Sequence, residues 1–103
     1  MKTILVMRHA KSSWGDSGLA DFDRPLNKRG ERDAPRMGHL LSAENLVPDA
    51  IVSSSAVRAR TTSEAVAVAS GFSGKLELAD DLYGSEASDY IGCLAARSDD
   101  ERR

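Results

Sequence analysis

The sequence of 103 residues is poor in several residue types: it has one cysteine, three prolines, two histidines and only 5% aromatic residues. A single cysteine, Cys93, cannot form an intrachain disulfide, and this favours a reducing compartment. The apolar stretch at the N-terminus, residues 3–7, is too short for a secretory signal or a membrane span. A net charge of −2 gives no general attraction for nucleic acid or anionic lipid. We therefore expect a cytoplasmic protein without nucleic-acid or membrane partners, in which any anion site is local.

The remaining composition, 41% hydrophobic and 29% charged, is typical of a globular protein, and the length predicts one domain over residues 1–103. A continuous apolar run, Ile4–Met7, predicts a strand that is covered on both faces. The polar segment that follows, residues 10–26, is longer than most connections, and such loops are often functional.

A helix is predicted after the loop, with Asn27 as its N-cap. Its apolar residues recur at helical spacing, at Ala34, Met37, Gly38 and Leu41. Because Pro35 lies inside this pattern, we expect either a kink or a late helix start.

Strands and helices alternate in the rest of the chain. Ala50–Ser53 is predicted as a second buried strand, followed by a helix that Ser54 or Ser55 caps and that ends near Gly71. A weaker strand over Lys75–Leu78 and a last helix beginning at Ser88 complete the pattern. Alternation of this kind predicts an α/β fold with a mainly parallel sheet and flanking helices.

Basic residues follow two of the predicted strands. Arg8 and His9 come directly after the first strand, and Arg58 lies in the first turn of the helix after the second. Ligands of open α/β sheets bind beyond the carboxyl ends of the strands. A helix N-terminus favours an anion, and a guanidinium can bind two phosphate oxygens at once. We expect these three residues, with Ser55, to bind a phosphoryl group, and a neutral His9 to attack phosphorus.

Four segments resemble the histidine phosphatase superfamily, and specifically its small SixA-like phosphohistidine phosphatase branch. They are "LVMRHAKSSW", "DFDRPLNKRGERDAPRMG", "PDAIVSSSAVRARTTSEAVA" and "LYGSEASD". The resemblance extends from Lys2 to about Leu94 and implies a phosphoglycerate-mutase-like fold. It also implies a phosphatase that needs no metal or organic cofactor and works through a covalent phosphohistidine.

The resemblance implies a role for individual residues. His9 matches the nucleophile, and Arg8 and Arg58 match two phosphate-binding arginines. Asp80, in "DDLYG", is the best match to the family's general acid, although the family usually has glutamate there. The other carboxylates that could donate the proton are Asp81, Asp16, Asp21 and Asp23. The implied substrate is a phosphorylated protein carrying phosphohistidine, or a small phosphate ester.

One family feature has no counterpart here. The family's pocket contains a second histidine, in a "GHN"-like loop after a C-terminal core strand, whereas this chain has only His9 and His39. His39 falls in the first predicted helix, away from any strand end. We therefore expect a histidine phosphatase domain that lacks its C-terminal strand and helix. The alternative to an active phosphatase is an impaired domain that only binds phosphate.

Overall fold

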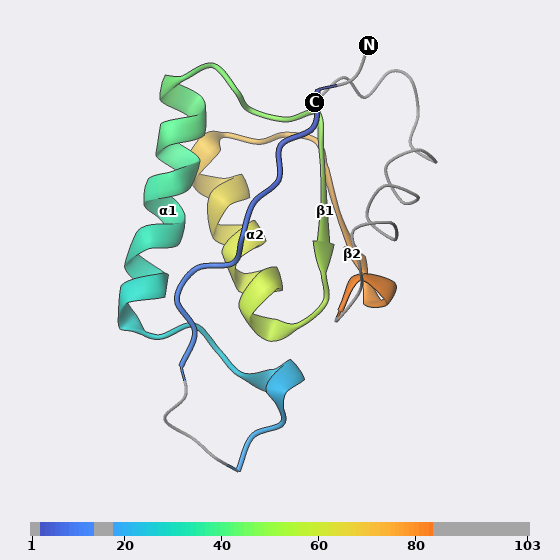
Figure 1. Cartoon of the computed structure of the whole chain (residues 1–103). Helices are drawn as coiled ribbons and strands as arrows, with labels where there is room; N and C mark the ends of the chain where they lie inside the picture. The colour runs from blue at the N-terminus through green and yellow to red at the C-terminus, as the bar shows by residue number, and fades with distance from the viewer. Residues whose placement is uncertain (1–2, 14–17, 84–103) are drawn as a thin grey trace.

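Two helices and two strands alternate along residues 3–13 and 18–83, the part of the chain that the computed structural model describes (Figure 1). In chain order, the regular elements are η1 (Asp21–Asp23), α1 (Lys28–Ala43), β1 (Ala50–Ser54), α2 (Val57–Ser70), β2 (Lys75–Ala79) and η2 (Asp80–Leu82), where η denotes a 3-10 helix. This arrangement confirms the predicted α/β class. The last predicted helix, from Ser88, and Cys93 lie outside the described residues.

The sheet consists of β1 and β2 paired in parallel, with Ala50 opposite Lys75 and Ser54 opposite Ala79. Parallel neighbours need a crossover connection, and α2 supplies it. Both strands therefore end at the same edge of the sheet. Figure 1 shows the N-terminus of α2, η1 and η2 all at this end of the molecule, toward which both strand arrows point.

Helix α1 begins where its cap predicts. The Asn27 side chain accepts a hydrogen bond from the Gly30 N–H at 2.8 Å, which satisfies one of the free donors of the first turn. The helix starts at Lys28 and runs through Pro35, so the predicted late start is wrong. The cap offsets only part of the cost of the hydrogen bond that Pro35 cannot donate.

Helix α2 ends as predicted but is not capped as predicted. Its last residue is followed by Gly71 in the left-handed conformation, φ 75°, which glycine adopts without strain. The N-cap is Ala56, whose side chain cannot accept a hydrogen bond, so neither Ser54 nor Ser55 caps the helix. The Ser54 hydroxyl instead accepts from the Ala56 N–H at 3.2 Å, and the Ser55 hydroxyl donates to Asp80.

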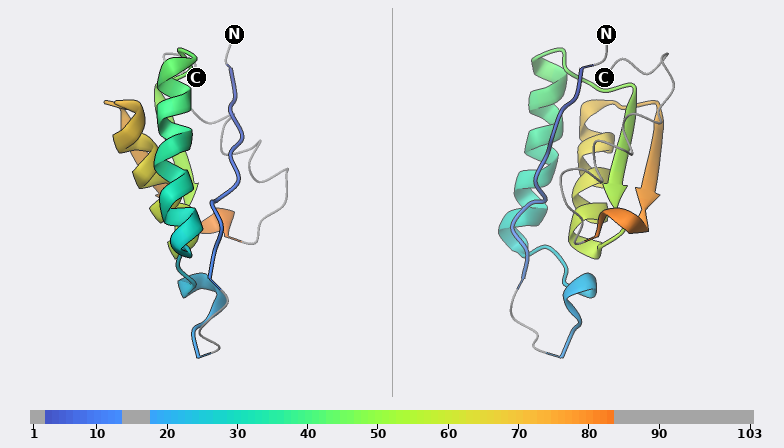
Figure 2. Two further views of the ribbon diagram at one scale, coloured as in Figure 1. Left: turned by 90° about the vertical axis from the view of Figure 1, so that its left-hand side faces the viewer. Right: turned by 45° about the vertical axis from the view of Figure 1, so that its right-hand side comes forward.

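The N-terminal segment does not form the predicted strand. Residues 3–11 have no regular structure, and the side chains of Ile4–Met7 are exposed, with Val6 at 93%. Figures 1 and 2 show the segment running alongside α1 without joining the sheet. An apolar run is a strand only where a neighbouring strand accepts and donates its backbone hydrogen bonds, and no described residue does so here.

The end of this segment is tied to the loop before α1. Ser12 and Leu26 form an antiparallel bridge. The Ser13 N–H donates to the Pro25 carbonyl at 2.8 Å, and the Asn27 N–H donates to the Lys11 carbonyl at 2.9 Å. This short ladder anchors the backbone just after His9.

The core is small and lies between the helices and the sheet. Its apolar members are less than a tenth exposed, and they are Leu26, Ala34, Ala56, Val66 and Leu82. Helices α1 and α2 approach closely at Gly38, because a Cβ built there would lie 2.7 Å from the Val66 carbonyl oxygen and 2.8 Å from Ala69 Cβ. None of the helices in the described part of the chain is long and apolar enough to cross a bilayer.

The close approach at Gly38 predicts that Gly38→Ala destabilises the fold. The added methyl would lie under 3 Å from the backbone of the partner helix, so we expect a cost in the upper part of the range for overpacking, about 3 kcal/mol, of which the gain in helix propensity of about 1 kcal/mol offsets only part. Ser42→Ala, at an exposed position of the same helix, should change the free energy of unfolding by less than about 0.5 kcal/mol. Urea unfolding measures both variants, and equal stability of Gly38→Ala and the parent chain would contradict the packing.

Candidate active site

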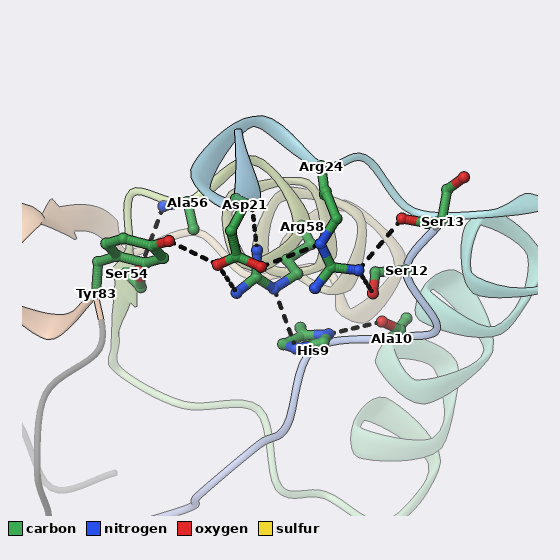
Figure 3. A network of polar contacts seen from close by, with 10 residues as sticks. All are labelled: His9, Ala10, Ser12, Ser13, Asp21, Arg24, Ser54, Ala56, Arg58 and Tyr83. Carbon is green, nitrogen blue, oxygen red and sulfur yellow. Dashed lines mark hydrogen bonds and ion pairs between the residues drawn. The ribbon is translucent and has the colours of Figure 1, made fainter. Parts of the chain in front are cut away.

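The candidate active site begins with a direct contact between two predicted residues. Arg58, in the first turn of α2, donates from Nε to His9 Nε2 at 3.3 Å (Figure 3). The two residues are far apart in the sequence and meet because β1 delivers the start of α2 to the sheet edge beside which the N-terminal segment passes. The predicted proximity of His9 and Arg58 therefore does not depend on a strand over residues 4–7.

The hydrogen bonds of His9 define its tautomer. Nδ1 lies 2.8 Å from the carbonyl oxygen of Ala10, which can only accept, so Nδ1 carries the proton. Nε2 faces the Nε–H of Arg58, which can only donate, so Nε2 carries a lone pair. In this arrangement Nδ1 is the donor and Nε2 is the acceptor, and this is the tautomer in which Nε2 could act as a nucleophile.

Thr62, a buried residue one turn after Arg58, connects the two partners. Its hydroxyl donates to the Arg58 carbonyl at 2.7 Å and accepts from the Ala10 N–H at 3.1 Å. The backbone next to His9 is therefore attached to the second turn of the helix that carries Arg58.

Asp21 is the other main partner of Arg58. Arg58 Nη1 donates to the Asp21 carbonyl oxygen at 2.6 Å, and Nη2 donates to Asp21 Oδ2 at 3.1 Å. The Tyr83 hydroxyl also donates to Oδ2, at 2.6 Å, and Arg24 Nε donates to Oδ1 at 3.1 Å. One carboxylate thus joins η1, α2, the residue after η2 and the loop before α1 (Figure 3).

These donors hold the pKa of Asp21 at about 2, below its ordinary value of 3.8. The largest cause is the hydrogen bond from Tyr83; partial burial opposes the shift, and Arg24 and Arg58 lower the pKa further. The same hydrogen bond, from the other side, raises the pKa of the Tyr83 hydroxyl. At neutral pH, Asp21 is a carboxylate and Tyr83 is a donor.

Arg24 and two aromatic rings complete the cluster. Arg24 is 8% exposed, and its Nη1 donates to Ser12 Oγ at 2.9 Å and to the Ser13 carbonyl at 3.2 Å. The rings of Phe22 and Tyr83 meet edge to face at 5.1 Å, and the Arg58 guanidinium lies 6.0 Å from the Tyr83 ring centre. Such contacts favour a fixed guanidinium.

The other predicted site residues fall in two places. Ser55 and Asp80 are hydrogen-bonded to each other beyond the ends of β1 and β2, and neither is bonded to His9 or Arg58 within the described residues. Arg8 is exposed and has no hydrogen bond or ion pair with residues 3–13 or 18–83. The structure therefore pairs His9 with Arg58 and Ser55 with Asp80, and Arg8 has neither kind of contact with the residues that it describes.

The alternative proton donors also lie in different places. Asp21 is at the centre of the cluster, and Asp23, in the same 3-10 helix, is exposed. Asp16 and the side chain of Asp81 lie outside what the structure describes. His39 is exposed on α1, as expected.

Sequence reasoning missed Arg24, Thr62 and Tyr83. Arg24 and Tyr83 lie within the segments that carried the family resemblance, "DFDRPL" and "LYGSEASD", but nothing in their spacing indicated that both would meet Asp21. Thr62 had a signal of helical spacing, since it follows Arg58 by four residues and so shares its helix face.

Comparison with protein families agrees with this geometry. The model of the histidine phosphatase superfamily (branch 1) matches residues 4–98. The chain belongs to the histidine phosphatase superfamily. The match includes every residue of the cluster around Asp21 and Arg58.

The relatives that this chain matches are longer than the chain itself. An uncharacterised protein of Mycobacterium tuberculosis is 43% identical over 82% of this chain and 51% of its own length. A 2,3-bisphosphoglycerate-dependent phosphoglycerate mutase of Mycobacterium leprae is 37% identical over 58% of this chain and 25% of its own length. The chain thus spans about half, or less, of these curated relatives.

The fold matches a solved structure in the same superfamily. The crystal structure of a candidate phosphohistidine phosphatase SixA from Agrobacterium tumefaciens superimposes with a TM-score of 0.83 and 33% identity. The match covers 90% of this chain and 60% of that one. The α/β fold of the SixA and phosphoglycerate mutase type is therefore confirmed.

The carboxylate cluster predicts how Asp21 titrates. Its native pKa of about 2 lies below the value of 3.8 for a free side chain, so its contribution to stability is complete above pH 3.8 and is lost as the pH falls through about 2. NMR of the Asp21 carboxyl carbon should therefore show a midpoint near pH 2 in the folded chain. In Tyr83→Phe, which removes the largest cause, the midpoint should move toward 3.8. An unchanged midpoint in that variant would contradict the assigned cause.

Proposed function

We propose that this chain carries the nucleophile and a phosphate-binding arginine of a phosphatase that acts through a covalent phosphohistidine on His9. The observation that carries the proposal is the orientation of the His9 ring, with Nδ1–H on the Ala10 carbonyl and the Nε2 lone pair facing Arg58. An imidazole held in this way can attack an electrophile through Nε2, and the Arg58 guanidinium lies next to the reacting atoms.

In the first step, the Nε2 lone pair attacks phosphorus. A bond forms between Nε2 and phosphorus, the bond between phosphorus and the leaving group breaks, and the leaving group takes a proton. Arg58, together with Arg8 as the second proposed phosphate ligand, stabilises the charge on the phosphoryl oxygens. Ser55 is proposed as a further ligand, since its hydroxyl lies just before the N-terminus of α2.

In the second step, water attacks the same phosphorus. The bond to Nε2 breaks, inorganic phosphate leaves, and His9 returns to the tautomer that the Ala10 carbonyl favours. The pair of steps needs no redox change and no bound metal, so the proposal includes no cofactor.

Asp80 is proposed as the proton donor. It follows β2 directly and lies at the sheet edge to which β1 brings the start of α2. Its carboxyl accepts a hydrogen bond from Ser55, which ties it to the loop that precedes Arg58. Asp21 suits this task less well, because donors occupy both of its oxygens.

We infer that phosphohistidine on a protein is the substrate class. The support is the 33% identity to a candidate phosphohistidine phosphatase over 90% of this chain. A small phosphate ester is the second candidate, and the 37% identity to a phosphoglycerate mutase favours it. The third candidate is an impaired protein that binds phosphate without turnover. The sequence has one histidine besides His9, and this residue, His39, is exposed on α1 and does not supply a second histidine to the site.

Covalent labelling tests the nucleophile. After incubation with a radiolabelled phosphoryl donor such as phosphoramidate, we expect acid-labile label on the parent chain and none on His9→Ala. His39→Ala is the matched control and should retain the label, since His39 is exposed on α1. Equal labelling of His9→Ala and the parent chain would contradict the proposed nucleophile.

The role of Asp80 is tested by the leaving group. Asp80→Asn should slow transfer from donors whose leaving group needs a proton by about 10²-fold or more, because general acid catalysis contributes on that order. Transfer from a donor with an acidic leaving group, such as para-nitrophenyl phosphate, should change much less. Rates measured with both donors decide the point, and an equal loss with both would assign Asp80 another role.

A further inference from the structure

Asp21 has a role that follows from its contacts. We propose that Asp21 is a positioning residue that orients the Arg58 guanidinium for phosphoryl transfer, and that Tyr83 in turn holds Asp21. The proposal rests on the proposed function of His9 and Arg58.

The first argument is the number of directions in which Arg58 is held. Its Nε–H points to His9, Nη1 binds the Asp21 carbonyl, and Nη2 binds Asp21 Oδ2. The side chain of Arg58 is only 13% exposed. A planar group held at all three nitrogens has a defined plane, so it loses little conformational freedom when a ligand arrives.

The second argument is that Asp21 leaves Arg58 free to bind a phosphoryl group. A guanidinium has five N–H donors, and Asp21 uses one on each of Nη1 and Nη2. When phosphorus approaches His9 Nε2, the Nε–H of Arg58 loses its partner and lies beside the new phosphoryl oxygens. Arg58 can therefore bind the phosphoryl group while Asp21 stays in place.

The third argument is that Asp21 is itself held on both oxygens. Arg24, which is buried, binds Oδ1, and Tyr83 binds Oδ2 at 2.6 Å. These donors come from different segments, so η1 is fixed relative to the end of β2 and to α2. Among residues 3–13 and 18–83, two guanidinium groups, those of Arg24 and Arg58, contact the one carboxylate of Asp21.

The test is NMR of the full chain with inorganic phosphate as the probe. His9 ring signals should shift as phosphate binds to the parent chain. Asp21→Asn should weaken phosphate binding by about tenfold, because a charged hydrogen bond to Arg58 is lost. Tyr83→Phe, which keeps the Asp21 charge, should weaken it by about two- to threefold. We expect an Arg58 Nε–H signal in the parent chain without phosphate, and this signal should broaden or disappear in Asp21→Asn.

Glu64→Gln is the matched control, because it removes one carboxylate from an exposed ion pair with Arg60 on the same helix. It should leave phosphate affinity and the Arg58 signal unchanged. Tighter phosphate binding by both Asp21→Asn and Tyr83→Phe would identify Asp21 as a competitor of phosphate and overturn the proposal, as would an unchanged Arg58 signal in Asp21→Asn. If the Arg58 signal responds as expected but phosphate does not shift His9 in the parent chain, positioning stands and the proposed function fails.

Discussion

Parallel pairing of β1 with β2 is the constraint on which the arrangement of the site depends. Two parallel neighbours end at one edge, so the residues that follow them must share that edge. The crossover helix begins there with Arg58, and η2 follows there with Asp80 and leads to Tyr83. His9 and Asp21 come from segments that precede β1, and long-range hydrogen bonds outside the sheet join them to Arg58.

The chemistry of the site is concentrated in one guanidinium between a ring and a carboxylate. Arg58 donates a hydrogen bond to His9 on one side and to Asp21 on the other, and the two contacts fix the orientation of its guanidinium. The His9 imidazole accepts the Arg58 Nε–H at Nε2. The hydrogen bond from Tyr83, together with Arg24 and Arg58, keeps the Asp21 carboxylate ionised at neutral pH. His9, the proposed nucleophile, and Asp21, the residue proposed to orient Arg58, thus lie on opposite sides of one guanidinium in this member of the histidine phosphatase superfamily.

Much of this was predictable from local patterns. Asn27, Gly71 and the apolar run in β1 are short-range signals, and all three marked their elements correctly. The motif residues His9 and Arg58 were predicted to meet, and they do.

What the sequence could not show depends on tertiary contacts. Ile4–Met7 has the composition of a buried strand, but a strand also needs partners, and no described residue pairs with it. The partners of Asp21 come from separate segments, so no residue spacing within one segment predicts these contacts. The shared hydroxyl of Thr62 has one more consequence: opening of the first two turns of α2 would release the Ala10 amide and displace Arg58 in a single event. The lifetime of the assembled site is then the lifetime of these two helical turns, and amide hydrogen exchange at Ala10 reports it.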